Sequence, residues 1–254
     1  MPAQNATQRF SDRVENYVRY RPGYPGEILN LLRERCGLTP SAAIADIGFG
    51  TGIFTRVLLE NGNPVFGIEP NREMREAGES FLAKYPAFRS IDAKAEQTSL
   101  PDSSVDFVTA AQAAHWFDRE PTRREFSRIL KPGGWVVLIW NERLTEGTPF
   151  QVEYEKLLLE HGTDYAQVRH ERTTNTIGEF FAPAPHEMVA FRTQQSFGFE
   201  GLEGRTFSSS YIPSPSDARS APIREALRDL FERHQVNDTV AFDYDTEVFF
   251  GRLS

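Results

Sequence analysis

The clearest chemical signal in the chain is an acid followed by three glycines at alternate positions, Asp46-Ile47-Gly48-Phe49-Gly50-Thr51-Gly52. A strand-like apolar run, residues 43–47, precedes the glycines, and a segment with helical spacing, residues 52–59, follows them. Glycines allow a tight turn and close approach of the backbone to a ligand, and ligands of open α/β sheets lie where strands end. The dinucleotide fingerprint is excluded because its sixth position, counted from Gly48, is Ile53, and no Gly-Lys-Ser/Thr follows to make a P-loop. The residues therefore predict a ligand-binding turn of another kind, or a turn without a ligand.

A second acid, Glu69, follows the next strand-like run in the sequence Gly67-Ile68-Glu69-Pro70. It lies 23 positions after Asp46, which is the length of one helix plus one strand. A carboxylate at a strand end can accept two charge-assisted hydrogen bonds from the 2′ and 3′ hydroxyls of a ribose. A lone glutamate in such a place is usually a solvated charge, but its distance from the glycine turn favours a ribose site.

Two further polar stretches follow later strand-like runs. The first is Asp92-Ala93-Lys94-Ala95-Glu96, which leads into Leu100-Pro101 and Val105-Asp106. The second is Gln112-Ala113-Ala114-His115-Trp116-Phe117-Asp118. Because the pKa of histidine lies near neutrality, His115 is interpreted either as a general base or substrate anchor, or as a ring that packs with Trp116.

Arginines and tyrosines precede the glycine turn at helical spacing. Arg13, Tyr17, Tyr20 and Arg21 can share one helical face, because they lie three and four residues apart. The alternative is an amphipathic helix that rests on the sheet and binds nothing.

Together these segments resemble the class I S-adenosylmethionine (SAM)-dependent methyltransferases, especially the type 11 and trans-aconitate-methyltransferase-like members, from about residue 8 to the C-terminus. The resemblance implies that SAM is the cofactor, that S-adenosyl-L-homocysteine is the product, and that a small molecule accepts the methyl group. By position, the expected cofactor-binding residues are Arg13, Tyr17, Tyr20, Asp46, Gly48, Gly50, Thr51, Gly52, Glu69, Pro70, Met74, Ala95, Glu96 and Gln112.

The resemblance also implies roles for these residues. The glycine loop packs against the cofactor's amino acid and ribose, while Asp46 orients the loop and reaches the ammonium group. Lys94 stands where the family has an acid, so the backbone of Ala95 and the side chain of Glu96 are expected to hold the adenine, with Asp92 as a substitute. An arginine of the N-terminal segment would pair with the cofactor's carboxylate, and its tyrosines would close over the methionine arm. His115 would face the transferring methyl group and is the candidate catalytic residue.

Behind these motifs, short apolar runs alternate with amphipathic segments from residue 43 to 141. Such alternation is typical of a parallel sheet covered on both faces, so the predicted fold class is α/β. The resemblance implies a Rossmann-like, mostly parallel seven-stranded sheet with helices on both faces and inserted cap segments. The expected strands are 43–47, 65–68, 88–91, 105–109, 135–140, 187–199 and 239–253, the last as one or two strands. The expected helices are 52–59, 72–84, 121–130, 149–161 and 222–234.

No linker, repeat or low-complexity tract divides the chain, so residues 1–254 are expected to form a single domain. Within it we expect an N-terminal lid segment (1–30), a cofactor-binding core (40–141) and substrate cap insertions (142–188 and 200–222). The acceptor would be bound by aromatic and basic residues of the insertions, which are Arg143, Tyr154, Tyr165, Arg169, Phe180 and Phe181.

Composition narrows the possible partners. With 28 Lys and Arg against 36 Asp and Glu, the net charge of −8 argues against a nucleic-acid binder. The single cysteine, Cys36, excludes an internal disulfide framework, and the five histidines show no metal-ligand spacing, so no metal is expected. No apolar stretch approaches the ~20 residues that span a bilayer, and no secretory signal is visible. We therefore expect a cytoplasmic monomer or homodimer without a membrane partner.

Two alternatives stay open. The first is a catalytically silent SAM-binding regulatory protein, which would bind the cofactor without turnover. The second is another enzyme on a similar sheet, either a dehydrogenase or an aminopropyl transferase. The missing sixth-place glycine argues against the dehydrogenase, and His115-Trp116-Phe117 stands where an aminopropyl transferase would need an acid-rich polyamine pocket.

Overall fold

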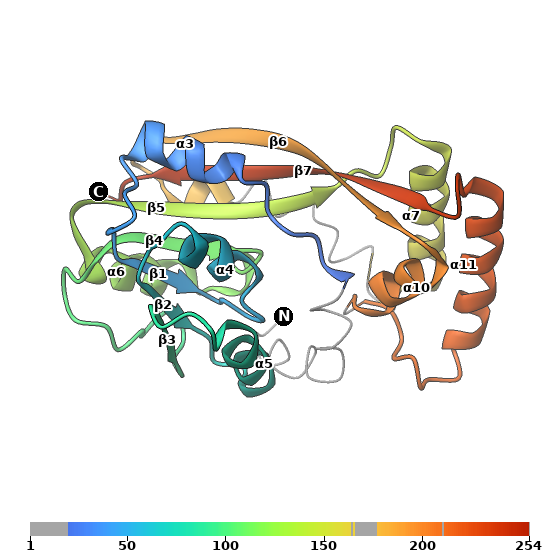
Figure 1. The fold of residues 1–254 in the computed structure, drawn as a ribbon, viewed down its shortest axis with the longest axis horizontal. Coiled ribbons are helices and arrows are strands. Elements are labelled where there is room, and N and C mark those ends of the chain that lie inside the picture. The colour runs from blue at the N-terminus through green and yellow to red at the C-terminus, as the bar shows by residue number, and fades with distance from the viewer. Residues whose placement is uncertain (1–19, 164, 166–176, 210, 254) are drawn as a thin grey trace.

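The computed structural model describes residues 20–163, 165, 177–209 and 211–253. In these residues one sheet is formed by the strands β1 (Ile44–Ile47), β2 (Val65–Ile68), β3 (Phe88–Ile91), β4 (Val105–Ala111), β5 (Leu130–Arg143), β6 (His186–Phe197) and β7 (Val240–Gly251). Their order across the sheet is β3-β2-β1-β4-β5-β7-β6 (Figure 1). β1 to β5 run parallel, and β7 runs antiparallel to both of its neighbours. The expected Rossmann-like, mostly parallel seven-stranded sheet is confirmed.

Helices cover both faces of this sheet. Those nearest the parallel strands are α3 (Glu27–Cys36), α4 (Ile53–Glu60), α5 (Arg72–Leu82) and α6 (Arg119–Ile129). On one face Phe54 of α4 belongs to the same buried cluster as Ile44 of β1. On the other face Phe126 of α6 is clustered with Ala45, the next residue of β1. Successive strand residues point to opposite faces, so two apolar neighbours such as Ile44 and Ala45 require helices on both sides.

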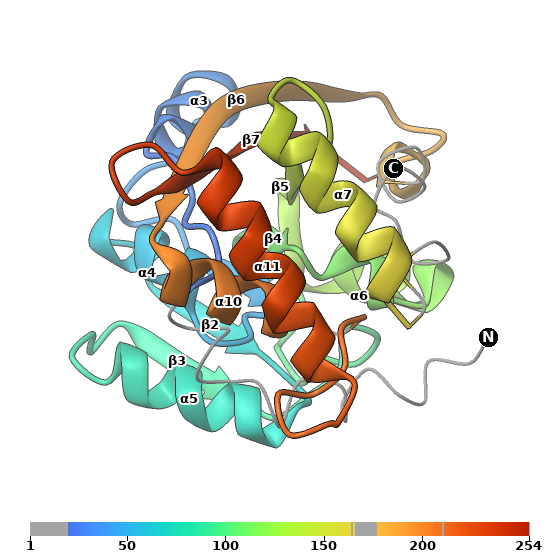
Figure 2. The same ribbon diagram turned by 90° about the vertical axis from the view of Figure 1, so that its right-hand side faces the viewer.

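The three longest strands carry a cap. β5 has 14 residues and β6 and β7 have 12 each, whereas β1, β2 and β3 have four each. The extra length projects past the short strands and carries α7 (Pro149–His161), α10 (Phe199–Phe207) and α11 (Ser220–His234) at one end of the molecule (Figures 1 and 2). A separate buried cluster that includes Tyr154, Leu202, Leu227 and Phe242 holds the cap together. The cap thus takes in α11, most of which lies outside the predicted insertions.

Two helices and part of a strand differ from the sequence-based expectation. Neither α3 nor α10 was predicted, and α10 contains Gly201 and Gly204, which weaken helices. A Cβ atom on Gly204 would lie 2.1 Å from the Tyr20 ring, so this glycine makes room for packing that the sequence does not reveal. β5 begins five residues before the predicted run, 135–140, and includes Gly133 at φ +80°.

The described ranges contain no membrane-spanning helix, no candidate metal site and no activated cysteine. None of the helices there is long and apolar enough to cross a membrane. No group of three or more His, Cys, Asp or Glu side chains in these ranges is placed to hold a metal ion. Burial raises the pKa of the Cys36 thiol to about 12, so the thiol stays protonated at neutral pH.

Candidate active site

A cavity of about 490 Å³ opens at the carboxyl ends of the parallel strands. Its walls come from four segments: the glycine loop (residues 46–52, of which all but Gly52 line the cavity), residues 69–71 after β2, residues 94–96 after β3, and residues 111–113 and 116–118 at the end of β4. Small-molecule sites typically have volumes of roughly 300–1,000 Å³. The four sequence motifs therefore meet at one cavity of suitable size.

The three glycines of the loop are needed for different reasons. All have positive φ angles, +70° at Gly48, +56° at Gly50 and +84° at Gly52, which side chains rarely adopt. A Cβ on Gly48 would also lie 2.6 Å from the Cβ of Ala113, and one on Gly52 would lie 2.7 Å from a methyl group of Leu82. At Gly50 the nearest side-chain atom would be the terminal methyl of Met74 at 3.3 Å, and Met74 itself lines the cavity. Close packing within the protein thus explains Gly48 and Gly52 better than ligand approach does.

Phe49 anchors the loop to its surroundings. Its ring is buried and meets Phe88 of β3 edge-on, with the ring centroids 5.3 Å apart. A Cβ on Gly67 of β2 or on Gly78 of α5 would lie 2.7 Å or 2.5 Å from this ring. Two glycines outside the motif therefore make space for the aromatic residue inside it.

Asp46 lies beneath the loop and is 1% exposed. Its two carboxylate oxygens accept hydrogen bonds from the hydroxyls of Thr55 at 2.6 Å and Thr109 at 2.7 Å, which joins β1 to α4 and β4. Burial raises the pKa of Asp46 to about 6, although both hydroxyls oppose the rise. Asp46 lines the cavity, and its position is fixed by the threonines.

Glu69 connects the glycine loop to the start of α5. One carboxylate oxygen accepts from the backbone N–H of Gly50 at 3.0 Å, and the other accepts from that of Asn71 at 2.8 Å. Asn71 caps α5 by accepting from the N–H of Met74 at 2.9 Å. Burial raises the pKa of Glu69, against the opposing effect of the two backbone hydrogen bonds. Since an ionised carboxylate has about four acceptor positions, Glu69 keeps acceptor capacity at the cavity wall.

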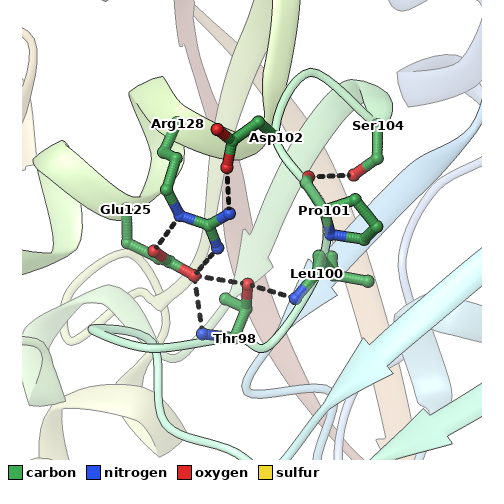
Figure 3. Close-up of polar contacts among 7 residues, drawn as sticks. All are labelled: Thr98, Leu100, Pro101, Asp102, Ser104, Glu125 and Arg128. Carbon is green, nitrogen blue, oxygen red and sulfur yellow. Dashed lines mark hydrogen bonds and ion pairs between the residues drawn. The ribbon is translucent and has the colours of Figure 1, made fainter.

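The loop after β3 is held by a buried acid of α6. Glu125 accepts hydrogen bonds from the backbone N–H and the hydroxyl of Thr98, at 2.7 Å and 2.6 Å, and it pairs with Arg128 (Figure 3). Arg128 also reaches Asp102 at 2.6 Å, so both ends of the segment 98–102 are tied to one helix. Burial alone would raise the pKa of Glu125, but the hydrogen bonds from Arg128 and Thr98 leave it lowered. This network fixes the loop whose residues Lys94, Ala95 and Glu96 line the cavity.

The end of β4 is strained where it meets the cavity. Gln112 has φ +58°, a conformation that non-glycine residues adopt at a cost. Its side-chain amide donates to the carbonyl of Asn141 at 3.1 Å, which ties the turn to β5. Trp116 and Phe117 line the cavity after this turn. His115 does not: it is exposed, and its ring lies 4.9 Å from that of Trp140 in an edge-on contact.

The remaining predicted cofactor residues fall into three groups. Thr51, Pro70 and Met74 line the cavity with the loop residues. Tyr20 and Asp92 do not line it, because Tyr20 is buried in the cap cluster and Asp92 pairs with Arg75 at 2.9 Å. Arg13 and Tyr17 lie outside the described residues.

A smaller pocket of about 50 Å³, named here the polar pocket, adjoins the cavity, and Tyr24, Ile53 and Gln112 line both. Of the predicted acceptor residues, Arg143 and Tyr165 line the polar pocket. Tyr154 lies beside it, with the Arg143 guanidinium 5.1 Å from its ring centroid. Phe180 and Phe181 instead belong to the buried cluster under α6, and Arg169 lies outside the described residues.

Sequence reasoning missed several residues that line these two spaces. The polar pocket is lined by Arg205 of α10, by Tyr244 of β7 and by Tyr211, which lies between α10 and α11. The cavity is lined by Phe49 and Asn71. The dyad alternation of β7 identifies Tyr244 as one of its inward-facing residues. No comparable local pattern marks Arg205, because an arginine on a short helix is usually solvated.

Comparison with known proteins agrees with this geometry. Residues 45–138 match the family described as "Methyltransferase domain". This segment of the chain is therefore similar to methyltransferase domains. The match covers the glycine loop, Glu69, the loop after β3 and the end of β4, whereas the cap lies outside it.

Curated relatives show a similar partial likeness. An uncharacterized methyltransferase of Mycobacterium tuberculosis is 38% identical over 136 residues, which cover 53% of this chain and 52% of that protein. An uncharacterized methyltransferase-like protein of Schizosaccharomyces pombe is 30% identical over 159 residues, which cover 62% of this chain and 60% of that protein. The chain thus spans about half the length of the curated relatives it matches, and its own activity and acceptor are matters for proposal.

Solved structures share the fold over most of the chain. A proposed type II methyltransferase from Anaeromyxobacter dehalogenans has a TM-score of 0.68 at 21% identity, covering 92% of this chain and 98% of that one. A proposed methyltransferase from an antibiotic biosynthesis pathway of Anabaena variabilis has a TM-score of 0.63 at 20% identity, and the match covers 96% of this chain and 100% of that one. At these identities the likeness establishes the fold, cap included, and nothing about the acceptor.

Proposed function

We propose that this chain is a SAM-dependent methyltransferase that acts on a small-molecule acceptor. The observation that carries the proposal is Glu69, a buried carboxylate that is tied by backbone hydrogen bonds to Gly50 and Asn71 and keeps acceptor capacity at the cavity wall. A diol such as the ribose of SAM supplies two hydroxyl donors for such an acid.

The residues of the cavity fit the cofactor in two further respects. The hydroxyl oxygen of Thr51 is buried and has no hydrogen-bond partner in the part of the chain that the structure describes, and Thr51 lines the cavity. A buried polar atom of this kind calls for a ligand or water. Asp46 lies under the same loop and supplies a carboxylate for an ammonium group.

SAM supplies a sulfonium methyl group, which an acceptor lone pair takes as the carbon–sulfur bond breaks and its electron pair returns to sulfur. The chain has to bind, orient and exclude water, since such a displacement depends mainly on alignment. Glu69 and the glycine loop would hold the ribose end, residues 94–96 would hold the base, and Trp116 and Phe117 would cover the cavity with apolar surface. The hydrogen bond of Gln112 to Asn141 would keep the β4 turn in place.

The need for a general base depends on the acceptor. An ionised carboxylate acceptor needs none, whereas a hydroxyl or an amine must lose a proton. His115 stays the predicted base for that second case, but it lines neither the cavity nor the polar pocket. Its ring contacts with Trp116 and Trp140 support packing as its role.

We further propose that the chain acts in the cytoplasm, as a monomer or homodimer, without nucleic-acid or membrane partners. The net charge of −8 supports the exclusion of nucleic acid, because phosphate binding favours basic surfaces.

Calorimetric titration of the purified chain with SAM and with S-adenosylhomocysteine tests the cofactor assignment, and we expect both to bind. Absence of binding by both would overturn the proposal. A labelled-methyl transfer screen against small carboxylic acids, phenols and amines then tests the activity. Binding without transfer to any acceptor would favour a catalytically silent SAM-binding protein instead.

A further inference from the structure

The polar pocket contains a buried cation, Arg205, for which the described residues supply no counter-ion. Arg205 is 5% exposed, and its guanidinium donates to the hydroxyls of Tyr244 at 3.3 Å and Ser209 at 3.2 Å. Across the described ranges, no carboxylate lies within ion-pairing distance of it. Burying a charge is costly unless the charge is paired, so this arrangement favours the binding of an anion in the polar pocket.

The neighbouring arginine of the polar pocket, Arg143, has a counter-ion within the protein. Arg143 also lines the polar pocket, but it forms a buried ion pair with Glu155 and donates to the hydroxyl of Tyr165 at 2.9 Å. Its charge is therefore neutralised within the protein. The difference between these two arginines identifies Arg205 as the group able to bind an external anion.

The surroundings of Tyr211 indicate the sign of the local potential. Burial would raise the pKa of Tyr211, but the charges of Arg205, Arg143 and Arg21 outweigh burial and lower it. Two acids partly offset these charges, because Glu142 lines the polar pocket and Glu155 pairs with Arg143. Among these described side chains the arginines outnumber the glutamates, a balance that favours an anion.

The polar pocket is too small for a whole substrate. A water molecule needs about 10–15 Å³ of such space, so the volume of about 50 Å³ admits only a few non-hydrogen atoms. A carboxylate group fits this limit. The rest of an acceptor would extend past Tyr24 and Gln112, which line both spaces, into the cavity where the methyl donor is proposed to bind.

We propose that the polar pocket holds the carboxylate of the methyl acceptor, with Arg205 as its binding residue and the hydroxyls of Tyr211 and Tyr244 beside it. The acceptor is therefore a small organic acid. This inference rests on the proposed methyltransferase function and adds the substrate class to it. An arginine fork suits a carboxylate because it offers two parallel donors.

Binding measurements test the inference apart from turnover. The chain is saturated with S-adenosylhomocysteine and titrated in a calorimeter with benzoate, cinnamate, succinate and glutarate, each beside its neutral amide. We expect at least one acid to bind and its amide to bind at least tenfold more weakly. If S-adenosylhomocysteine binds but none of the acids does, or if acids and amides bind alike, the acid site is overturned while the proposed function stands. If S-adenosylhomocysteine itself fails to bind, both proposals fail.

Variants locate the site. Arg205→Met removes the charge at similar length, and we expect acid binding to weaken at least tenfold while the Kd of S-adenosylhomocysteine changes less than twofold. Arg205→Lys should restore part of the acid binding. Arg228→Met, an exposed arginine of α11 outside the polar pocket, is the matched control and should change neither affinity.

Tyr211→Phe keeps the ring and removes the hydroxyl, so it tests the site even if Arg205→Met fails to fold. We expect it to weaken acid binding and to spare S-adenosylhomocysteine. Unchanged acid binding in the folded variants would overturn the proposal. An equal loss of S-adenosylhomocysteine affinity would also overturn it, because the polar pocket would then serve the carboxylate of the cofactor.

Discussion

The side chain of Glu69 accepts a hydrogen bond from the backbone of Gly50, with 3.0 Å between the carboxylate oxygen and the nitrogen. One residue follows β2 and the other belongs to the turn after β1, and these strands are paired in register from Ile44 and Val65 onward. The glycine loop and the acid beside it thus behave as one unit. A change at Glu69 alters both the ligand wall and the support of the loop.

Replacing Glu69 with Gln should weaken binding of S-adenosylhomocysteine about 10- to 100-fold, because hydrogen bonds to a charged group contribute about 1.5–3 kcal/mol. Calorimetry measures the effect, and circular dichroism checks that the variant is folded. Glu73→Gln, on the exposed side of α5, is the control and should bind normally. A folded Glu69→Gln variant with an unchanged Kd would remove Glu69 from the site.

Asp46 should make stability depend on pH. Its pKa is raised from 3.8 to about 6 in the folded protein, so between these values the folded state holds a proton that the unfolded state has lost. The contribution of this group to stability is therefore complete below about pH 4 and is lost as pH rises through about 6, by about 3 kcal/mol in all.

Denaturant unfolding of wild type and Asp46→Asn between pH 4 and 7 checks this dependence. The stability of wild type relative to the variant should fall across that range, since asparagine does not titrate. Thr55→Val removes a hydrogen bond that lowers the pKa, so it should move the transition to higher pH. A stability difference that stays constant with pH would contradict the assignment.

Glu125 should make stability depend on pH in the opposite direction. Because its pKa is lowered in the folded protein, it stabilises above its unfolded pKa, and this contribution is lost as pH falls through the folded value. Glu125→Gln should cost about 1–3 kcal/mol at pH 7, since it breaks a buried network around Thr98 and Arg128. The cost should shrink below about pH 4. Glu120→Gln, at an exposed position of the same helix, should have little effect at any pH, and equal effects of the two changes would refute the anchoring role.

His115→Ala separates packing from catalysis. We expect kcat/KM with an acceptor from the transfer screen to stay within about threefold of wild type, because the imidazole lines neither the cavity nor the polar pocket. Thermal unfolding should show a modest loss from the contacts with Trp116 and Trp140. General acid–base catalysis typically contributes about 10²–10⁴-fold, so a fall of that size with normal cofactor affinity would restore His115 as the base.

Local patterns in the sequence were sufficient to predict most of the strands and helices of the core. The predicted bounds of the strands 65–68 and 88–91 and of the helix 149–161 agree with the structure residue for residue. In these segments the spacing of apolar residues and the residues that mark the ends of an element indicate the same bounds. Thr148 forms a capping box with Gln151, and Pro149 takes the first helical position. In such segments the local preference and the packed structure favour the same conformation.

Features that depend on distant packing could not be predicted in this way. Gly204 lies in a helix because the Tyr20 ring fills the space beside it, and these residues are far apart in the sequence. Arg205 is buried only because the cap folds over it. For the same reason Tyr20, predicted at the cofactor, is found in the cap cluster.

The length of β5 has a consequence for how acceptor choice can vary. The strand starts in the cofactor-binding half, passes residue 138, where the domain match stops, and ends at Arg143 in the wall of the polar pocket. Beside it, β7 is paired without interruption from Gly251 to Tyr244. A continuous backbone ladder thus sets the distance between the cavity proposed to hold the methyl donor and the polar pocket proposed to hold the acceptor. Under the proposed function, a chimera that exchanged only the cap helices would keep that distance and change the acceptor.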